Sequence, residues 1–472
     1  MSTTDLYNAA PLVSVSFLVF LVILLESLVK RAENLSYWVS AAGLAVCALV
    51  SMSTIGSSGT AFNGMLVVGG YAGLFASLFI LSALVTILLS REYLRRQHSH
   101  VGEYYLLVLF ATLGMMFMAA AGDLIIIFLG LELMSISLYV LAGFNRKRLI
   151  SNESSLKYFL LGAFATGFLL YGIAFLYGAA GTTNIPGIVG QFPGIAASDY
   201  FWVGLGLLMV GLAFKVGAVP FHMWIPDVYQ GSPTTVSGFM STGAKAAAFS
   251  AFVLVFAHSG FGAYPRLRMV LAILSAASMV LGNIVAVAQS NIKRMLAYSS
   301  IAHAGYMIIG LAAFNQLGRD GILYYLTAYT FMNLGAFGII SVLEVEEDRN
   351  LSFEDYSGLA AKRPFLAALM SLFMLSLAGI PPLAGFFGKY YLFVAAVQAD
   401  LTWLAIVGVL MSVVSAYYYL RLIMVMYFRA DTGAEPVMPS GVCLATLAIA
   451  ALLVIGLGIY PSSVLAVISS LR

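Results

Sequence analysis

Four ionisable side chains lie inside long apolar runs of this chain: Glu132, Lys215, Lys245 and Lys389. Removing a charge from water is costly, so an apolar run rarely keeps one without a function. A lysine that has lost its hydration can take up and release a proton near neutral pH, whereas an arginine stays protonated. Three lysines and one carboxylate therefore predict a proton relay.

Each of these residues also has a structural interpretation. Glu132 and Lys215 can form a buried ion pair that only holds two helices together, and Lys389 can extend along its own helix toward polar headgroups. Lys245 is far from both ends of its run and reaches water least easily. A carboxylate about 4 Å from an ammonium contributes about 4 kcal/mol at an effective dielectric of about 20. Making and breaking a Glu132–Lys215 contact is therefore enough to load and unload a lysine.

Two histidines lie close to these runs. His222 follows a Gly–Pro interruption, and His303 lies near the end of another apolar run. Each is either an auxiliary relay group or a hydrogen-bonded core residue. His98 and His100 lie in a charged segment, and we expect both to be solvated.

The composition explains why these charges are unusual. The chain has 472 residues, of which 61% are hydrophobic and 9% are charged, and its mean hydropathy is +0.98. Soluble domains are about 25% charged, so the solvent of this chain is expected to be lipid. The sequence contains no basic stripe that would indicate nucleic-acid binding.

Fourteen apolar runs predict an all-α polytopic membrane protein. A bilayer core of about 30 Å needs about 20 apolar residues per helix, and only helices satisfy every backbone group within such a run. A β-barrel would show alternating segments of about ten residues instead. The predicted helices are 12–29, 37–53, 68–90, 104–121, 124–144, 156–178, 201–231, 236–257, 269–289, 296–314, 321–343, 365–398, 401–428 and 442–460.

The positive charges predict an orientation. Of the 23 lysines and arginines, sixteen lie in loops on one side of this map and three are Lys215, Lys245 and Lys389. Only four lie on the other side: Arg266, Arg268, Arg319 and Arg472. Cytoplasmic loops carry the excess of positive charge, so both termini are expected on the outer side, which requires an even number of helices.

Two of the predicted helices are interrupted. The seventh contains Gly217 and Pro220, and the twelfth contains Gly379, Pro381 and Pro382. Proline removes a backbone donor and clashes with the preceding turn, so each site predicts a helix break that lines a cavity. The breaks are five helices apart, which is typical of inverted repeats with a site at the membrane midplane.

The repeats predict four regions. These are a three-helix segment over 1–102, a first repeat over 103–258 (helices four to eight), a second repeat over 259–430 (helices nine to thirteen) and a last helix within 431–472. Lys215 precedes its break whereas Lys389 follows its own, which departs from strict repeat symmetry.

No metal site or leader is expected from the residues. Cys47 and Cys443 lie far apart in apolar runs and cannot supply a four-ligand site. The first apolar run lacks a positive segment before it and is followed by Lys30 and Arg31, so we interpret it as a membrane helix and not as a signal peptide.

Three segments resemble a known family. The segments 215–229 (KVGAVPFHMWIPDVY), 299–306 (SSIAHAGY) and 379–386 (GIPPLAGF) are similar to signatures of the antiporter-like subunits of respiratory complex I, which Mrp-type antiporter subunits share. The resemblance covers nearly the whole chain, and its motifs are specific.

Within that family the chain is most similar to the N-type subunits. Lys389 occupies the position where the M-type has glutamate, and the run around Asn333 replaces a histidine- and lysine-containing run of the other types. The long C-terminal lateral helix of the L-type is absent from this sequence.

The resemblance implies roles for the residues already singled out. Glu132 and Lys215 would be a modulating pair, Lys245 the central relay and Lys389 the terminal proton-exchange residue. His222 and His303 would be auxiliary. The chain would be a non-redox subunit of a proton-translocating NADH-quinone oxidoreductase in a bacterial inner membrane.

The resemblance also implies partners. The chain would hold no cofactor, and NAD, FMN, iron–sulfur clusters and quinone would belong to partner subunits, including other membrane-arm subunits. A Mrp-type cation/proton antiporter subunit and a purely structural scaffold remain as alternatives.

Overall fold

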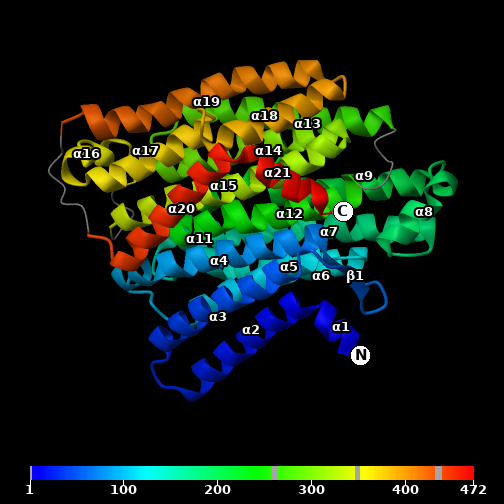
Figure 1. The fold of residues 1–472 in the computed structure, drawn as a ribbon, viewed down its shortest axis with the longest axis horizontal. Coiled ribbons are helices and arrows are strands. Elements are labelled where there is room, and N and C mark those ends of the chain that lie inside the picture. The colour runs from blue at the N-terminus through cyan, green and yellow to red at the C-terminus, as the bar shows by residue number, and fades with distance from the viewer. Residues whose placement is uncertain (1–2, 258–263, 346–350, 431–437, 472) are drawn as a thin grey trace.

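The computed structural model describes residues 3–257, 264–345, 351–430 and 438–471. The long helices run side by side, with α2 (Ala10–Leu28) and α3 (Glu33–Ser53) at one edge and α19 (Thr402–Phe428) at the opposite edge (Figure 1). Arg349 and Arg472 of the charge count, and the region boundaries at 258/259 and 431, lie outside the described residues.

Each of the fourteen predicted runs contains helix. The elements up to residue 257 are α1 (Thr3–Asn8), α2, α3, β1 (Ser58–Ala61), β2 (Leu66–Gly69), α4 (Gly70–Arg96), α5 (Glu103–Ala119), α6 (Leu124–Ala142), α7 (Leu149–Ala180), α8 (Ile185–Ile195), α9 (Asp199–Val216), α10 (Trp224–Gly231), α11 (Thr234–Phe239), the π-helix η1 (Met240–Ala244), α12 (Lys245–Phe252) and the π-helix η2 (Val253–Ala257).

The second half is helical as well. Its elements are α13 (Pro265–Val287), α14 (Ile292–Ala313), α15 (Gln316–Leu343), the short 3₁₀ helix η5 (Glu354–Tyr356), α16 (Leu359–Lys362), α17 (Pro364–Ala378), α18 (Ala384–Gln398), α19, α20 (Gly441–Ile459) and α21 (Pro461–Ser470).

Twelve helical segments of the described residues are long and apolar enough to cross a membrane. The predicted helices 104–121 and 365–398 correspond to shorter pieces, namely α5 with 17 residues and the pair α17 and α18 with 15 residues each. The chain is thus a multi-pass helical membrane protein.

One small element departs from the all-helical prediction. Strands β1 and β2 form an antiparallel hairpin in which Ser58 pairs with Gly69 and Ala61 with Leu66. The turn contains Asn63 and Gly64, both with positive φ. An Asn-Gly pair is a strong hairpin signal, but a prediction from long apolar runs does not detect it because the hairpin is short.

Both predicted helix breaks are confirmed. Helix α9 ends at Val216 and α10 begins at Trp224, while α17 ends at Ala378 and α18 begins at Ala384. The residues after the first halves are Gly217 with φ 75° and Gly379 with φ 89°. This left-handed conformation favours glycine, and each glycine N–H caps carbonyls of the preceding turn.

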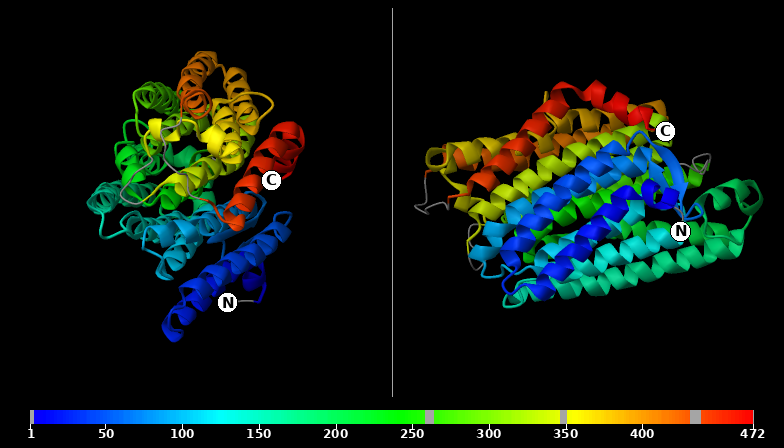
Figure 2. Two further views of the ribbon diagram at one scale, coloured as in Figure 1. Left: turned by 90° about the vertical axis from the view of Figure 1, so that its left-hand side faces the viewer. Right: turned by 60° about the horizontal axis from the view of Figure 1, so that its bottom comes forward.

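The centre of the bundle is formed by three segments: α11 through η2, α14 and α15. Nearly all their residues are buried inside the protein. Outer helices such as α7 and α19 expose large apolar side chains, as a lipid-facing surface requires. Figure 2 shows α2 and α3 projecting from this bundle, away from α19.

Candidate functional site

Lys245 lies at the centre of the bundle. It is the first residue of α12, directly after the π-helix η1, and its side chain is 2% exposed. Its ammonium donates to the carbonyl and to the hydroxyl of Ser300 on α14, and it lies 5.9 Å from the ring centre of Tyr329. Short π-helical insertions in α-helices occur frequently at functional sites.

Lys389 reaches back across its helix break. Its ammonium donates to the carbonyl of Ala378, the last residue of α17, at 3.0 Å. It also lies 4.8 Å from the ring centre of Tyr306. The C-terminal end of a helix carries partial negative charge, so α17 stabilises this ammonium without a carboxylate.

Lys215 is related to its helix break in a different way. It belongs to the last turn of α9, whereas Lys389 lies in the half-helix after its break and reaches back to the end of α17. The departure from repeat symmetry in the sequence is therefore present in the structure as well.

Lys215 is held by hydroxyls and rings. It donates to Ser135 Oγ at 2.7 Å and to Tyr139 OH at 3.3 Å, both on α6. Glu132 lies on the same face of α6, one turn before Ser135. Among the described residues, no carboxylate oxygen lies within 4.0 Å of the Lys215 ammonium, and Glu132 Oε1 is buried without a hydrogen-bond partner.

His303 lies between Lys245 and Lys389. Its Nδ1 and Nε2 make hydrogen bonds with Tyr325 OH at 2.6 Å and with Tyr419 OH at 3.0 Å. On α14 it comes one turn after Ser300, which contacts Lys245, and one turn before Tyr306, which lies against Lys389. One face of α14 therefore connects Lys245 with Lys389 through polar side chains.

Not every predicted residue belongs to the polar connection between Lys245 and Lys389. The contacts of Lys215 described above reach α6, and none of them reaches Lys245. His222 lies in the first break, where its Nδ1 is buried without a hydrogen-bond partner. His98 is exposed as expected, but His100 is half-buried against the ring of Tyr105.

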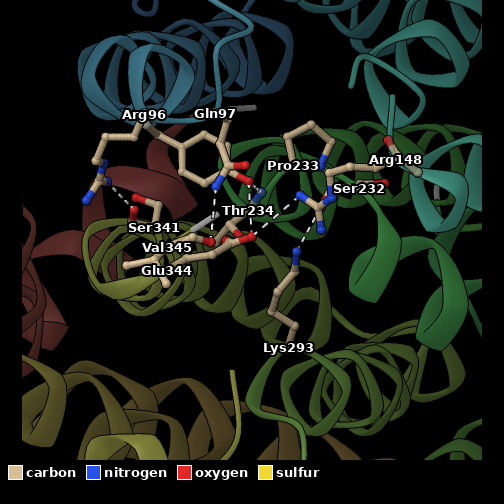
Figure 3. A network of polar contacts seen from close by, with 12 residues as sticks. Arg96, Gln97, Arg148, Ser232, Pro233, Thr234, Lys293, Ser341, Glu344 and Val345 are labelled. Carbon is tan, nitrogen blue, oxygen red and sulfur yellow. Dashed lines mark hydrogen bonds and ion pairs between the residues drawn. The ribbon is translucent and has the colours of Figure 1, made fainter. Parts of the chain in front are cut away.

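Several buried charges were not predicted, and Lys293 and Glu344 are the two most deeply buried of them. Lys293, which the charge count places in a loop, is fully buried, and so is Glu344. Figure 3 shows both in one polar network with Arg148 and Thr234. Each residue lies at the end of an apolar run next to other charges, so nothing in the sequence distinguishes it from a solvated loop residue.

Within the described part of the chain, no three histidine, cysteine, aspartate or glutamate side chains gather as a metal site would require. Cys47 and Cys443 are buried and do not form a disulfide. The side chains of the described centre that can exchange a proton are those of lysine, histidine and tyrosine.

Known proteins match this chain over most of its length. Residues 121–415 match the family model described as NADH:quinone oxidoreductase/Mrp antiporter, TM. NADH-quinone oxidoreductase subunit N 1 of Chloroherpeton thalassium is 47% identical, with 97% of this chain and 96% of that protein covered. Subunit N of Trichlorobacter lovleyi is 49% identical, with 85% and 82% covered.

Solved structures show the same fold. A chain of respiratory complex I from Thermus thermophilus has a TM-score of 0.85 and 38% identity, with 97% of this chain and 98% of that chain covered. A chain of the Mrp complex from Dietzia sp. has a TM-score of 0.86, with 98% and 96% covered, but its 21% identity shows the fold alone. The chain therefore belongs to the family of NADH-quinone oxidoreductase subunit N, the antiporter-like membrane subunits of respiratory complex I.

Proposed function

We propose that this chain moves protons across the membrane through its buried lysines, driven by quinone reduction in partner subunits. The observation that carries the proposal is the burial of Lys215, Lys245 and Lys389 in the bundle with hydroxyl, carbonyl and aromatic partners. An ammonium without a carboxylate partner can give up its proton without leaving a buried anion behind.

Each residue has a role in this proposal. Lys245 is the central relay, and Lys389 exchanges protons at the end of the path. His303 and its tyrosines carry protons between them along α14. Glu132 and Lys215 form the modulating pair, whose distance changes when the first helix break moves. His222 is auxiliary to that break.

The proposed architecture has fourteen membrane crossings. In it, α5 is one crossing, and α9 with α10 and α17 with α18 are one broken crossing each. The first inverted repeat spans 103–258 and the second spans 259–430, with 1–102 before them and 431–472 after them. Two glycine-capped breaks with a lysine at each half-helix end support this division.

The proposed setting is the membrane arm of the complex. NAD, FMN, iron–sulfur clusters and quinone would be bound by partner subunits in a bacterial inner membrane. Both termini would lie on the outer side, and Figure 1 shows the two ends of the chain at the same end of the helices.

The test is Lys245→Met in the intact complex, with Lys30→Met as a control because Lys30 is exposed at the end of α2. Proton uptake into membrane vesicles is driven by NADH and normalised to the amount of intact complex on a native gel. We expect Lys245→Met to lose proton uptake and Lys30→Met to keep it. Assembled Lys245→Met complex with wild-type proton uptake would refute the proposal.

The same assay separates the alternatives. A Mrp-type antiporter would require sodium or another cation on the opposite side, whereas the proposed function requires only NADH and quinone. A scaffold would assemble and leave proton uptake unchanged in all three single lysine-to-methionine variants.

A further inference from the structure

Glu344 is a fully buried carboxylate near the end of the bundle that carries most of the positive charge. It follows α15 directly and accepts hydrogen bonds from Thr234 Oγ1 and from Tyr93 OH, the latter at 3.3 Å. Arg148 lies 3.8 Å from its Oε1. Three further elements thus converge on one carboxylate: α4, the start of α7 and the start of α11 (Figure 3).

Other charged and titratable groups also face this carboxylate. Lys293 on α14 is fully buried and donates to the Ser232 carbonyl at 2.8 Å. Arg96 on α4 donates to the last carbonyls of α15, and the phenol of Tyr356 lies within electrostatic range of Glu344. The Glu344 cluster, meaning Glu344 with Tyr93 and Thr234, is therefore a polar site surrounded by cations.

A surface pocket lies on the other side of Gln97 from this cluster and includes none of the cluster residues in its lining. It has a volume of about 360 Å³ and is lined by Gln97, Glu103, Arg146 and Lys147, among others. The amide of Gln97 also donates to the carbonyl of Val345, the residue after Glu344, at 3.4 Å. Gln97 therefore joins the lining of the pocket to the residue that follows Glu344.

A row of buried hydroxyls begins beside the cluster. Ser82, Thr86 and Ser90 recur at every fourth position of α4, so they share one face, and each is at most 1% exposed. Tyr104 OH on α5 makes hydrogen bonds to Ser90 Oγ at 2.8 Å and to Thr235 Oγ1 at 2.9 Å. Thr235 adjoins Thr234 of the Glu344 cluster.

The row ends one turn from Lys245. Ser82 Oγ makes a hydrogen bond to Thr242 Oγ1 in the π-helix η1 at 3.1 Å. We call this row the hydroxyl seam; it consists of Ser82, Thr86, Ser90, Tyr104, Thr235 and Thr242.

Asn333 completes the connection to Lys245. Its amide donates to Ser241 Oγ, next to Thr242, at 2.6 Å and to Tyr329 OH at 3.0 Å. The ring of Tyr329 in turn lies beside Lys245, with its centre 5.9 Å from the ammonium. Asn333 Oδ1 is buried and has no partner among the described residues, and such an atom normally binds an internal water.

We propose that protons reach Lys245 from the pocket at Gln97 through the Glu344 cluster and the hydroxyl seam, with water joining the bonded pairs. The inference rests on the proposed function of Lys245. Glu344 accepts a proton at the inner end, and each hydroxyl then accepts one proton while giving its own to the next group. The protein gains and loses no atoms over the full transfer.

Helix packing is the competing explanation for the seam. Small hydroxyl residues let membrane helices approach closely, and Thr86 and Ser90 each donate to the carbonyl one turn earlier. If packing were their only role, removing a hydroxyl while keeping the shape of the side chain would leave the deuterium isotope effect of the assembled complex unchanged.

The experiment uses Tyr104→Phe, Thr86→Val and Ser90→Ala in the intact complex. Ser77→Ala is the matched control, because Ser77 is also buried on α4 and donates one turn back, but its side-chain partner is Ser51 on α3. NADH-driven proton uptake is measured per intact complex in H₂O and in D₂O.

We expect Tyr104→Phe to slow proton uptake about tenfold, because Tyr104 bridges α4 and α11, and to enlarge the deuterium isotope effect. Ser77→Ala should match wild type in both. A packing defect would lower the rate without changing the isotope effect. If the three seam variants behave like Ser77→Ala, the route is wrong.

A further variant, Glu344→Gln, tests independently whether Glu344 belongs to the route. Assembled complex with normal proton uptake would remove Glu344 from the route, and if the variant does not assemble, the three seam variants decide. The proposed function and the proposed route can fail separately. Normal proton uptake by Lys245→Met refutes the proposed function, whatever the seam variants do. Loss of proton uptake in Lys245→Met, together with normal proton uptake in the seam variants, refutes only the route.

Discussion

At the scale of single residues, a substitution of Lys215 tests two roles for the Glu132–Lys215 pair. The pair is either a switch, in which Lys215 gains and loses a proton, or a clamp, which only holds two helices together. Its ammonium contacts Ser135 and Tyr139, while Glu132 stays beyond 4.0 Å. A switch needs a group that can lose its proton, so we expect Lys215→Arg to assemble but to lose most NADH-driven proton uptake, because a guanidinium stays protonated.

The control for this prediction is Lys157→Arg. Lys157 is an ion-paired surface lysine, 2.8 Å from Asp227, and arginine can keep that pair. Its proton uptake should equal that of wild type. If Lys215→Arg also pumps at the wild-type rate per assembled complex, Lys215 is a clamp and exchanges no proton.

At the scale of elements, the second helix break positions Lys389. A Cβ added at Gly379 would lie 3.2 Å from Lys389 Cδ, and the φ of 89° disfavours any L side chain. Gly181, which ends α7, also has positive φ, but nothing lies within 4 Å of its Cβ position. Gly379→Ala and Gly181→Ala should each lose about 1 kcal/mol of folding free energy.

Only Gly379→Ala should also reduce proton uptake per assembled complex, because only there does the new methyl group displace a relay lysine. Thermal unfolding of the purified complex measures the shared backbone cost, and vesicle assays measure proton uptake. Equal proton uptake in both alanine variants would mean that the break does not position Lys389.

At the scale of the whole molecule, an even number of crossings puts both termini on one side. Single cysteines introduced as Thr3→Cys and Ser470→Cys should react with a membrane-impermeant maleimide from the outside of intact cells, and Lys147→Cys should react only from the inside. Cys47 and Cys443 are 3% and 4% exposed, so they should contribute little background. Labelling of Thr3→Cys and Ser470→Cys from opposite sides would contradict the fourteen-crossing topology.

Most of the helices could be predicted from the sequence, because a segment that lies in lipid has only one way to satisfy its backbone groups. A run of apolar residues must become a helix, since no water is present to satisfy a free backbone. For the same reason, the Gly–Pro interruptions at Gly217 and Gly379 predict breaks that the structure confirms. The hairpin around Asn63 and Gly64 lies outside this rule, because it joins two helices in a segment that is not uniformly apolar.

The burial of Lys215, Lys245 and Lys389 follows from the amino-acid order alone, because a charge in the middle of an apolar run has few routes to water. The groups that surround these lysines depend on the packing of the helices. The ring of Tyr306 against Lys389 and the phenol of Tyr93 against Glu344 are side chains from helices far apart in sequence. Such contacts follow from how helices pack, which periodicity and composition do not encode.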